Sequence, residues 1–142
     1  MIKKLTQDSP SDWEAVFSIW LETNKSAHSF IDESYWENAL PMVKEIMPSA
    51  SVYVYTDKDK VVGFIGLVDN MIEGIFISQN YQGKGIGKKL LSFAKNEFET
   101  LQLSVYKENH SAYGFYVKEN FSVISESTDE TGHVEYTMEW HK

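Results

Sequence analysis

A glycine-rich turn between a predicted strand and a predicted helix constrains this chain more than any other segment. It spans residues 82–91 and reads QGKGIGKKLL. The residues before it, MIEGIFI, have the apolar and β-branched character of a strand, and a helical stretch and a second strand, LQLSVY, follow it. A strand, a turn, a helix and a strand in this order form a βαβ unit, so the two strands are expected to run parallel in one sheet.

The residues before this unit predict an antiparallel meander. Residues 51–77 contain three runs rich in β-branched and aromatic residues, which turns at Asp57–Asp59 and Asp69–Asn70 separate. Gly74, within the third run, has no side chain to pack and is typical of a bulge or of a close approach of backbone to a ligand. We therefore expect a mixed, mostly antiparallel sheet with parallel pairing at the βαβ unit.

Helical patterns near the N-terminus and a hairpin at the C-terminus complete the expected fold. One amphipathic helix begins near Ser9–Ser11, and a second spans residues 32–47 with Pro41 inside it. A polar loop, NKSAHSFIDES, connects them, and residues 121–141 read as a β-hairpin. The sequence predicts a single mixed α/β domain, residues 1–142, with helices on both faces of its central sheet.

The charge and composition of the chain narrow its partners. Thirteen Lys and Arg residues against 21 Asp and Glu residues give a formal net charge of -8, which repels nucleic-acid phosphates and an anionic membrane surface. The absence of cysteine excludes a disulfide framework, a thiolate nucleophile and a thiolate metal site. No apolar run approaches the ~20 residues of a membrane span, and the N-terminus lacks a signal-peptide core. We expect a cytoplasmic protein without a metal, a nucleic-acid partner or a membrane partner.

The glycine turn predicts an anion site of a particular kind. Backbone N–H groups at a helix N-terminus, together with the positive end of the helix dipole, attract phosphates. A Walker A loop would need glycine at Gln82 and a hydroxyl residue at Lys89. The dinucleotide fingerprint would need its last glycine at Lys88 or at Leu90. Both motifs fail, so the phosphates are not those of a P-loop nucleotide or a Rossmann dinucleotide.

Two segments together resemble the GNAT superfamily of N-acetyltransferases. Residues 82–87 resemble its Gln/Arg-x-x-Gly-x-Gly/Ala pyrophosphate loop, and NHSAYGFYVKENF resembles its second landmark, Asn-x-x-Ala-x-x-Phe-Tyr-x-x-x-Gly-Phe. Asn120 stands where that landmark has glycine, and Asn tolerates the left-handed backbone better than other non-glycine residues. The resemblance covers residues 71–121 and implies a GNAT-like fold and acetyl-CoA-dependent transfer of an acetyl group directly to a primary amine.

The resemblance also implies which residues bind the acetyl donor. Backbone of the strand before the turn would hold pantetheine and polarise the thioester carbonyl, the turn would hold the pyrophosphate, and an asparagine and a tyrosine would complete the site. The residues so implied are Phe76, Ile77, Gln82, Gly83, Lys84, Gly85, Ile86, Gly87, Lys88, Asn109 and Tyr116. Asn109 is equally suited to cap the short helix that follows it.

Two residues are candidates for the proton transfers. Tyr116 matches the family's tyrosine that protonates the departing thiolate. Glu73 lies on the strand that leads into the turn, where family members often place a carboxylate, and it is our candidate base for the acceptor amine. Partial burial would raise its pKa toward a useful value. Each residue also has a possible non-catalytic role: Tyr116 as a packed aromatic residue of the core, and Glu73 as a carboxylate on the face of a strand.

The acceptor side is the part of the chain without a family motif. We expect the loop between the first two helices and the terminal hairpin to form it, with Trp20, His28, Phe30 and Tyr136 as candidate walls. His28 is an alternative base or an ordinary solvated histidine. We expect the acceptor to be a small-molecule, amino-acid-derived or protein amine. A non-catalytic acyl-CoA sensor is the alternative function, and a homodimer is the oligomer that the family suggests.

Overall fold

The protein forms one seven-stranded sheet in a computed structural model that describes residues 1–142. Its strand order is β1-β2-β3-β4-β5-β7-β6, and every neighbouring pair is antiparallel except β4 and β5. The strands are β1 (Ile2–Lys4), β2 (Ser51–Asp57), β3 (Lys60–Val68), β4 (Met71–Ile77), β5 (Thr100–Tyr106), β6 (Ser122–Thr128) and β7 (Val134–His141). The predicted mixed sheet with a βαβ unit is therefore confirmed.

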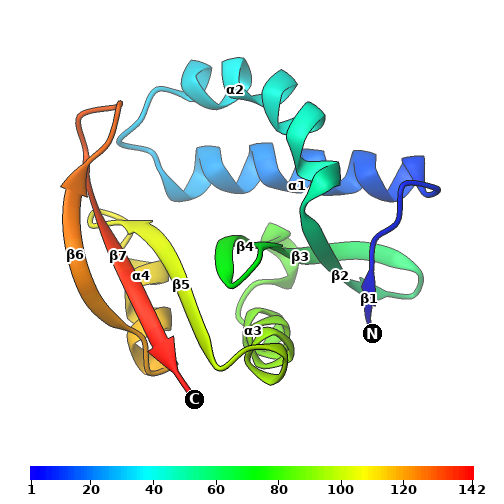
Figure 1. Ribbon diagram of the computed structural model, residues 1–142. Coiled ribbons are helices and arrows are strands. Elements are labelled where there is room, and N and C mark those ends of the chain that lie inside the picture. Colours follow the sequence, from blue (N-terminus) through cyan, green and yellow to red (C-terminus); the bar gives the residue numbers. More distant parts are fainter.

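Helices cover both faces of the sheet, as predicted. The first two, α1 and α2, lie together on one side, while α3 and α4 lie on the other (Figure 1). Their bounds are α1 (Pro10–Ala27), α2 (Glu33–Ile46), α3 (Ile86–Glu97) and α4 (His110–Lys118), with short 3-10 helices η1 (Met47–Ser49) and η2 (Gln79–Tyr81). No helix combines the length and apolar character that crossing a lipid bilayer requires.

The first helix is longer than the sequence pattern indicates. It continues to Ala27, so the connection to α2 shrinks from the predicted polar loop to residues 28–32. Two polar side chains near the end of α1 form hydrogen bonds with its backbone. Thr23 Oγ1 donates to the Ile19 carbonyl at 2.6 Å, and Asn24 Nδ2 donates to the Trp20 carbonyl at 2.9 Å. The α1–α2 connection is therefore short.

Strand β3 separates two apolar cores. Its central residues are all buried, which explains why its sequence is continuously apolar rather than alternating. Phe64 belongs to the core beneath α1 and α2, whereas Ile65 belongs to the core beneath α3 and α4. Both side chains are 0% exposed, so both faces of the sheet centre are sealed.

A bulge in β4 opens the sheet next to β5. Gly66 pairs with Gly74 while Leu67 pairs with Ile72, so Glu73 is the extra residue on β4. A side-chain carbon at Gly74 would lie 2.4 Å from the Phe76 ring, which explains the glycine. The parallel pairing with β5 is confined to Met71 and Ile72 of β4, so the two strands separate beyond the bulge. The predicted bulge is confirmed, and the gap beside it places the site described next.

Candidate active site

Two adjoining cavities lie at the gap between β4 and β5. The first has a volume of about 770 Å³ and extends over the glycine turn, the edge of β4 and the N-terminal end of α4. The second has a volume of about 280 Å³ and lies on the side of the sheet that α1 and α2 cover. The residues that line both are Asn24, His28, Ile75, Phe76, Asn109, Ala112 and Tyr116. A ligand in either cavity would therefore touch the same wall.

The glycine turn forms an open cradle at the start of α3. Gly83 has a φ of 76° and Gly85, the N-cap of α3, has a φ of 83°, and no atom lies within 4 Å of a side-chain carbon placed on either. The first intrahelical bond joins the Lys89 amide to the Gly85 carbonyl at 3.1 Å. The preceding amides of α3 therefore have no backbone partner and remain available to an anion.

The side chains around the cradle have different positions. Gln82 Nε2 donates to the Ile77 carbonyl at 2.9 Å, which ties the turn to the end of β4. Ile86, Gly87 and Lys88 line the first cavity, whereas Lys84 does not and instead lies with its Nζ 5.3 Å from the Tyr81 ring centroid. The predicted turn residues therefore line the cavity except Lys84.

Along the exposed edge of β4, every second residue directs its backbone amide and carbonyl toward the gap. Ser78 donates its amide to the Val62 carbonyl at 2.8 Å, and Phe76 pairs with Phe64 in the same register. Because backbone groups in a strand alternate in direction, Phe76 faces β3 while Ile75 and Ile77 direct their amides and carbonyls toward the gap. The Phe76 ring stacks on Phe64 with centroids 4.9 Å apart, so its side chain belongs to the core.

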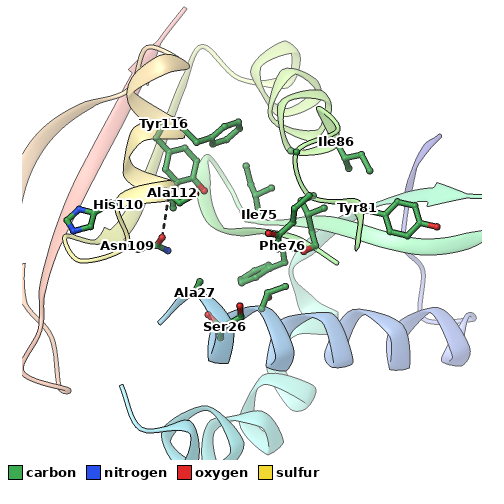
Figure 2. Close-up of a pocket in the computed structure, with 18 of the residues that line it drawn as sticks. Ser26, Ala27, Ile75, Phe76, Tyr81, Ile86, Asn109, His110, Ala112 and Tyr116 are labelled. Carbon is green, nitrogen blue, oxygen red and sulfur yellow. Dashed lines mark hydrogen bonds between the residues drawn. The ribbon is translucent and has the colours of Figure 1, made fainter. Parts of the chain in front are cut away.

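Tyr116 lies at the wall between the two cavities. Tyr116 is 7% exposed, and its ring packs edge-on against Phe115 and Phe121. The hydroxyl points into the cavity between α4 and β4 (Figure 2) and has no hydrogen bond to the protein. Burial raises the pKa of Tyr116 above its ordinary value, so the phenol is protonated at neutral pH.

Asn109 joins the two sides of the site. Its Oδ1 accepts a hydrogen bond from the Ala112 amide at 3.3 Å and so caps α4, as predicted. Its Nδ2 lies 3.2 Å from His28 Nε2. An amide NH₂ group only donates, so His28 Nε2 accepts this bond and the ring proton lies on Nδ1.

Replacing Asn109 with alanine is expected to lower the free energy of unfolding by about 1 kcal/mol, because the cap of α4 is lost. The same change removes the donor that fixes the His28 ring. Urea unfolding measures the effect, with Asn109→Asp as the matched control because aspartate still caps the helix. An alanine variant as stable as the wild type would contradict the capping role.

His28 is half-buried and lines both cavities, so the predicted alternative of an ordinary solvated histidine does not hold. Its ring stacks on Trp36 with centroids 5.2 Å apart and meets Tyr106 edge-on at 5.1 Å. Burial lowers the pKa of His28, and the Asn24 backbone carbonyl opposes this effect only in part. His28 is therefore neutral at neutral pH, and its available lone pair already accepts the Asn109 bond.

The other predicted wall residues separate into two groups. Trp20 is buried and lines the second cavity. Phe30 packs against His28, with the ring centroids 5.7 Å apart, and lines neither cavity. Tyr136 packs against Tyr113 at 5.5 Å. It lies on the opposite face of the sheet, under α4, away from the second cavity.

The carboxylates of the second cavity are Glu73 and Glu135. Glu73 is exposed, so the partial burial that the sequence predicted for it is absent. Glu135, on β7, is half-buried. Its burial raises its pKa, and the negative charge of the nearby Asp129 raises it further. Sequence reasoning missed Glu135, along with the cavity walls Trp36 and Tyr106. The polar positions of β7 alternate with apolar ones, but the pattern does not indicate that α1 and α2 cover them.

Comparisons with known proteins identify a matching family and similar sequences. The family model of the acetyltransferase (GNAT) domain matches residues 18–142. The peptidyl-lysine N-acetyltransferase YiaC of Escherichia coli K12 is 28% identical over 133 residues, which cover 92% of this chain and 91% of that protein. The peptidyl-lysine N-acetyltransferase YjaB of Salmonella typhimurium is 30% identical over 128 residues, 89% of this chain and 88% of that protein.

A solved structure shares the fold at lower sequence identity. The PaiA N-acetyltransferase of Thermoplasma acidophilum, in complex with coenzyme A, superposes with a TM-score of 0.82 at 23% identity. The alignment covers 100% of this chain and 98% of that chain. The protein therefore shares its fold with a protein that was solved in complex with coenzyme A.

Proposed function

The chain belongs to the GNAT family of acetyltransferases, and on that premise we propose that it acetylates the ε-amino group of lysine side chains in proteins. The coarser activity follows from the family: the protein is an acetyl-CoA-dependent N-acetyltransferase whose acceptor is an amine. A sensor that only binds acyl-CoA is not favoured. The observation that carries the lysine proposal is a small, aromatic-walled cavity with two unpaired carboxylates, which adjoins the donor cavity.

The first cavity fits acetyl-CoA. Its cradle leaves space at Gly83 and Gly85 where a side chain would stand, and unpaired amides of α3 face that space. A long, narrow ligand can continue from the cradle along β4, whose free edge offers backbone partners like those of a missing strand. We propose that Gly83, Gly85, Ile86, Gly87 and Lys88 hold the pyrophosphate.

The free edge of β4 also suits the reacting end of the donor. Acetyl-CoA supplies an activated thioester, and its carbonyl is polarised when a backbone amide donates to the oxygen. Ile75 and Ile77 are the residues whose backbone groups face the gap, and the Ile77 carbonyl is already occupied by Gln82. We therefore propose that the amides of Ile75 and Ile77 bind the donor, with Asn109 at the other side of the gap.

Tyr116 is proposed as the residue that stabilises the departing sulfur. Its hydroxyl is protonated, unbonded and directed into the gap. A thiol has a pKa near 8.5 and a phenol near 10, so transfer of the phenol proton to the thiolate is not favourable by itself. The hydroxyl must therefore donate a hydrogen bond as charge develops on sulfur, and complete the transfer only as the amine nitrogen releases its own proton.

The second cavity suits the side chain of lysine. Trp20, Trp36 and Tyr106 supply apolar and aromatic surface for a methylene chain and a cation, and Glu73 and Glu135 supply negative charge. The relatives YiaC and YjaB are peptidyl-lysine N-acetyltransferases by name. Their similarity over most of this chain supports the same acceptor class here.

The test is acetyl transfer to peptides that carry one lysine and a blocked N-terminus. Thiol release and a mass increase of one acetyl group on the lysine are the expected results. The same peptide with dimethyl-lysine in place of lysine is the control, and simple amines and free amino acids form the comparison panel. Turnover on small amines with none on the lysine peptides would overturn the proposed acceptor.

A further inference from the structure

Glu135 is a half-buried carboxylate without a partner of opposite charge. Its side chain accepts no hydrogen bond from the protein, and none of the protein's ion pairs includes Glu135 or Glu73. Removing a carboxylate from water without a partner is costly. Such a residue is therefore suited to a cation that arrives with the substrate.

The surroundings of Glu135 do not supply that cation. Tyr106, which pairs with Glu135 between β5 and β7, donates its hydroxyl to Asp129 instead. Tyr35 of α2 donates to Glu130 at 2.5 Å. These bonds place two further carboxylates in the turn that precedes β7, so the negative potential at this end of the cavity is reinforced rather than neutralised.

The titratable groups near Glu135 come from several elements. They are Tyr35 of α2, His28 at the end of α1, Glu73 of β4, Tyr106 of β5, Tyr116 of α4, and Asp129 and Glu130 before β7. His28 is neutral and hydrogen-bonded, and the tyrosines are protonated at neutral pH. The protonation states of His28 and of the three tyrosines therefore do not change between pH 7 and 9. A pH dependence of the activity in this range arises from the substrate amine.

We propose that Glu135 binds the ammonium group of the acceptor and takes its proton, directly or through one water, before the nitrogen attacks. The inference rests on the proposed function only in that the acceptor is a primary amine. Glu135 and Tyr116 both line the second cavity, so a ligand that fills this cavity contacts both residues. Two further polar groups of residues that line this cavity lack a partner, because the buried Nδ1 of His28 and Nε1 of Trp36 bond to no protein atom.

Glu135 and Tyr116 together account for every proton that moves during the transfer. The ammonium gives one proton to Glu135, and the freed lone pair forms the bond from nitrogen to the acetyl carbon. The carbon–sulfur bond breaks with its electron pair on sulfur. Sulfur takes the Tyr116 proton, Tyr116 regains one from nitrogen, and Glu135 releases its proton to solvent. Ammonium and thioester thus become amide, thiol and one free proton.

Glu135 is better placed for this role than Glu73. Both carboxylates line the second cavity, but Glu73 is exposed and Glu135 is half-buried. Partial burial raises the pKa of Glu135 and so makes its carboxylate a stronger base, while water can reach Glu73 freely. The two residues therefore form a matched pair for an experiment.

The test compares Glu135→Gln with Glu73→Gln in the full chain. With the amine that the wild type acetylates best, we expect Glu135→Gln to lower kcat/KM at pH 7 by about 100-fold or more. The residual activity should rise about tenfold per pH unit up to pH 9, because only free amine then reacts and lysine titrates near 10.4. Glu73→Gln should lower kcat/KM at least tenfold less than Glu135→Gln does, because Glu73 adds charge to the cavity but does not take the proton. Acetyl-CoA affinity should be unchanged in both variants.

Several outcomes would overturn the inference. Wild-type activity in Glu135→Gln would do so, as would a large loss in Glu73→Gln alone. Loss of acetyl-CoA binding together with turnover would show a structural role instead. If the glutamine variant does not fold, Glu135→Asp should retain activity to within about tenfold, and a complete loss in the folded aspartate variant would also contradict the proposal. A wild type active on small amines but not on lysine peptides would overturn only the proposed function.

Discussion

Tyr116→Phe is expected to lower kcat by about 100- to 1,000-fold while the affinity for acetyl-CoA stays the same. The hydroxyl points into the gap and has no protein partner, so its loss leaves the folded structure without an unsatisfied group. Sulfur would then leave as a thiolate without a donor beside it. Steady-state thiol release and a separate binding titration with coenzyme A measure the two effects.

Tyr113→Phe is the matched control for this change. Tyr113 lies on the same helix, packs against Tyr136 and lines neither cavity. It should keep wild-type kcat, and both variants should unfold at the same urea concentration as the wild type. Equal activity of Tyr116→Phe and wild type would show that Tyr116 acts only through packing, and a sensor function would regain support if neither protein turned over any amine.

The donor side of the site could be predicted because its chemistry lies in short, continuous segments. Gly83 and Gly85 adopt the left-handed backbone that their sequence favours, and Asn109 caps the next helix at the spacing that capping requires. Asn120 has a φ of 71°, as its place in the motif indicates. Local backbone preference decides each of these features, so the sequence pattern contains the information.

The acceptor side could not be predicted because distant segments create it. Tyr106 and Glu135 share one sheet face only because β5 pairs with β7, and that face is enclosed only because α1 and α2 pack over it. An alternating strand pattern reports which positions are polar, not whether a helix covers them. The sequence left the role of His28 open for the same reason: its neighbours in sequence are polar, while its neighbours in space are Trp36 and Tyr106.

Gly85→Ala should weaken acetyl-CoA binding by about 10- to 100-fold, which corresponds to losing one charge-assisted hydrogen bond of about 1.5–3 kcal/mol. Gly85 has a φ of 83°, so an alanine there is strained by roughly 1–2 kcal/mol. Relief of that strain would turn the following amides of α3 away from the pyrophosphate, and the new methyl group would stand in the cradle. Isothermal titration with coenzyme A measures the affinity, and urea unfolding measures the strain.

Gly114→Ala provides the comparison that separates these effects. Gly114 lies inside α4, and no atom lies within 4 Å of a side-chain carbon placed there. Alanine in a helix interior should raise the free energy of unfolding by about 0.5–1 kcal/mol and leave coenzyme A affinity unchanged. Undiminished binding in Gly85→Ala, despite its lower stability, would show that the amides at the start of α3 do not hold the pyrophosphate. The phosphate groups would then have to bind elsewhere along the cavity.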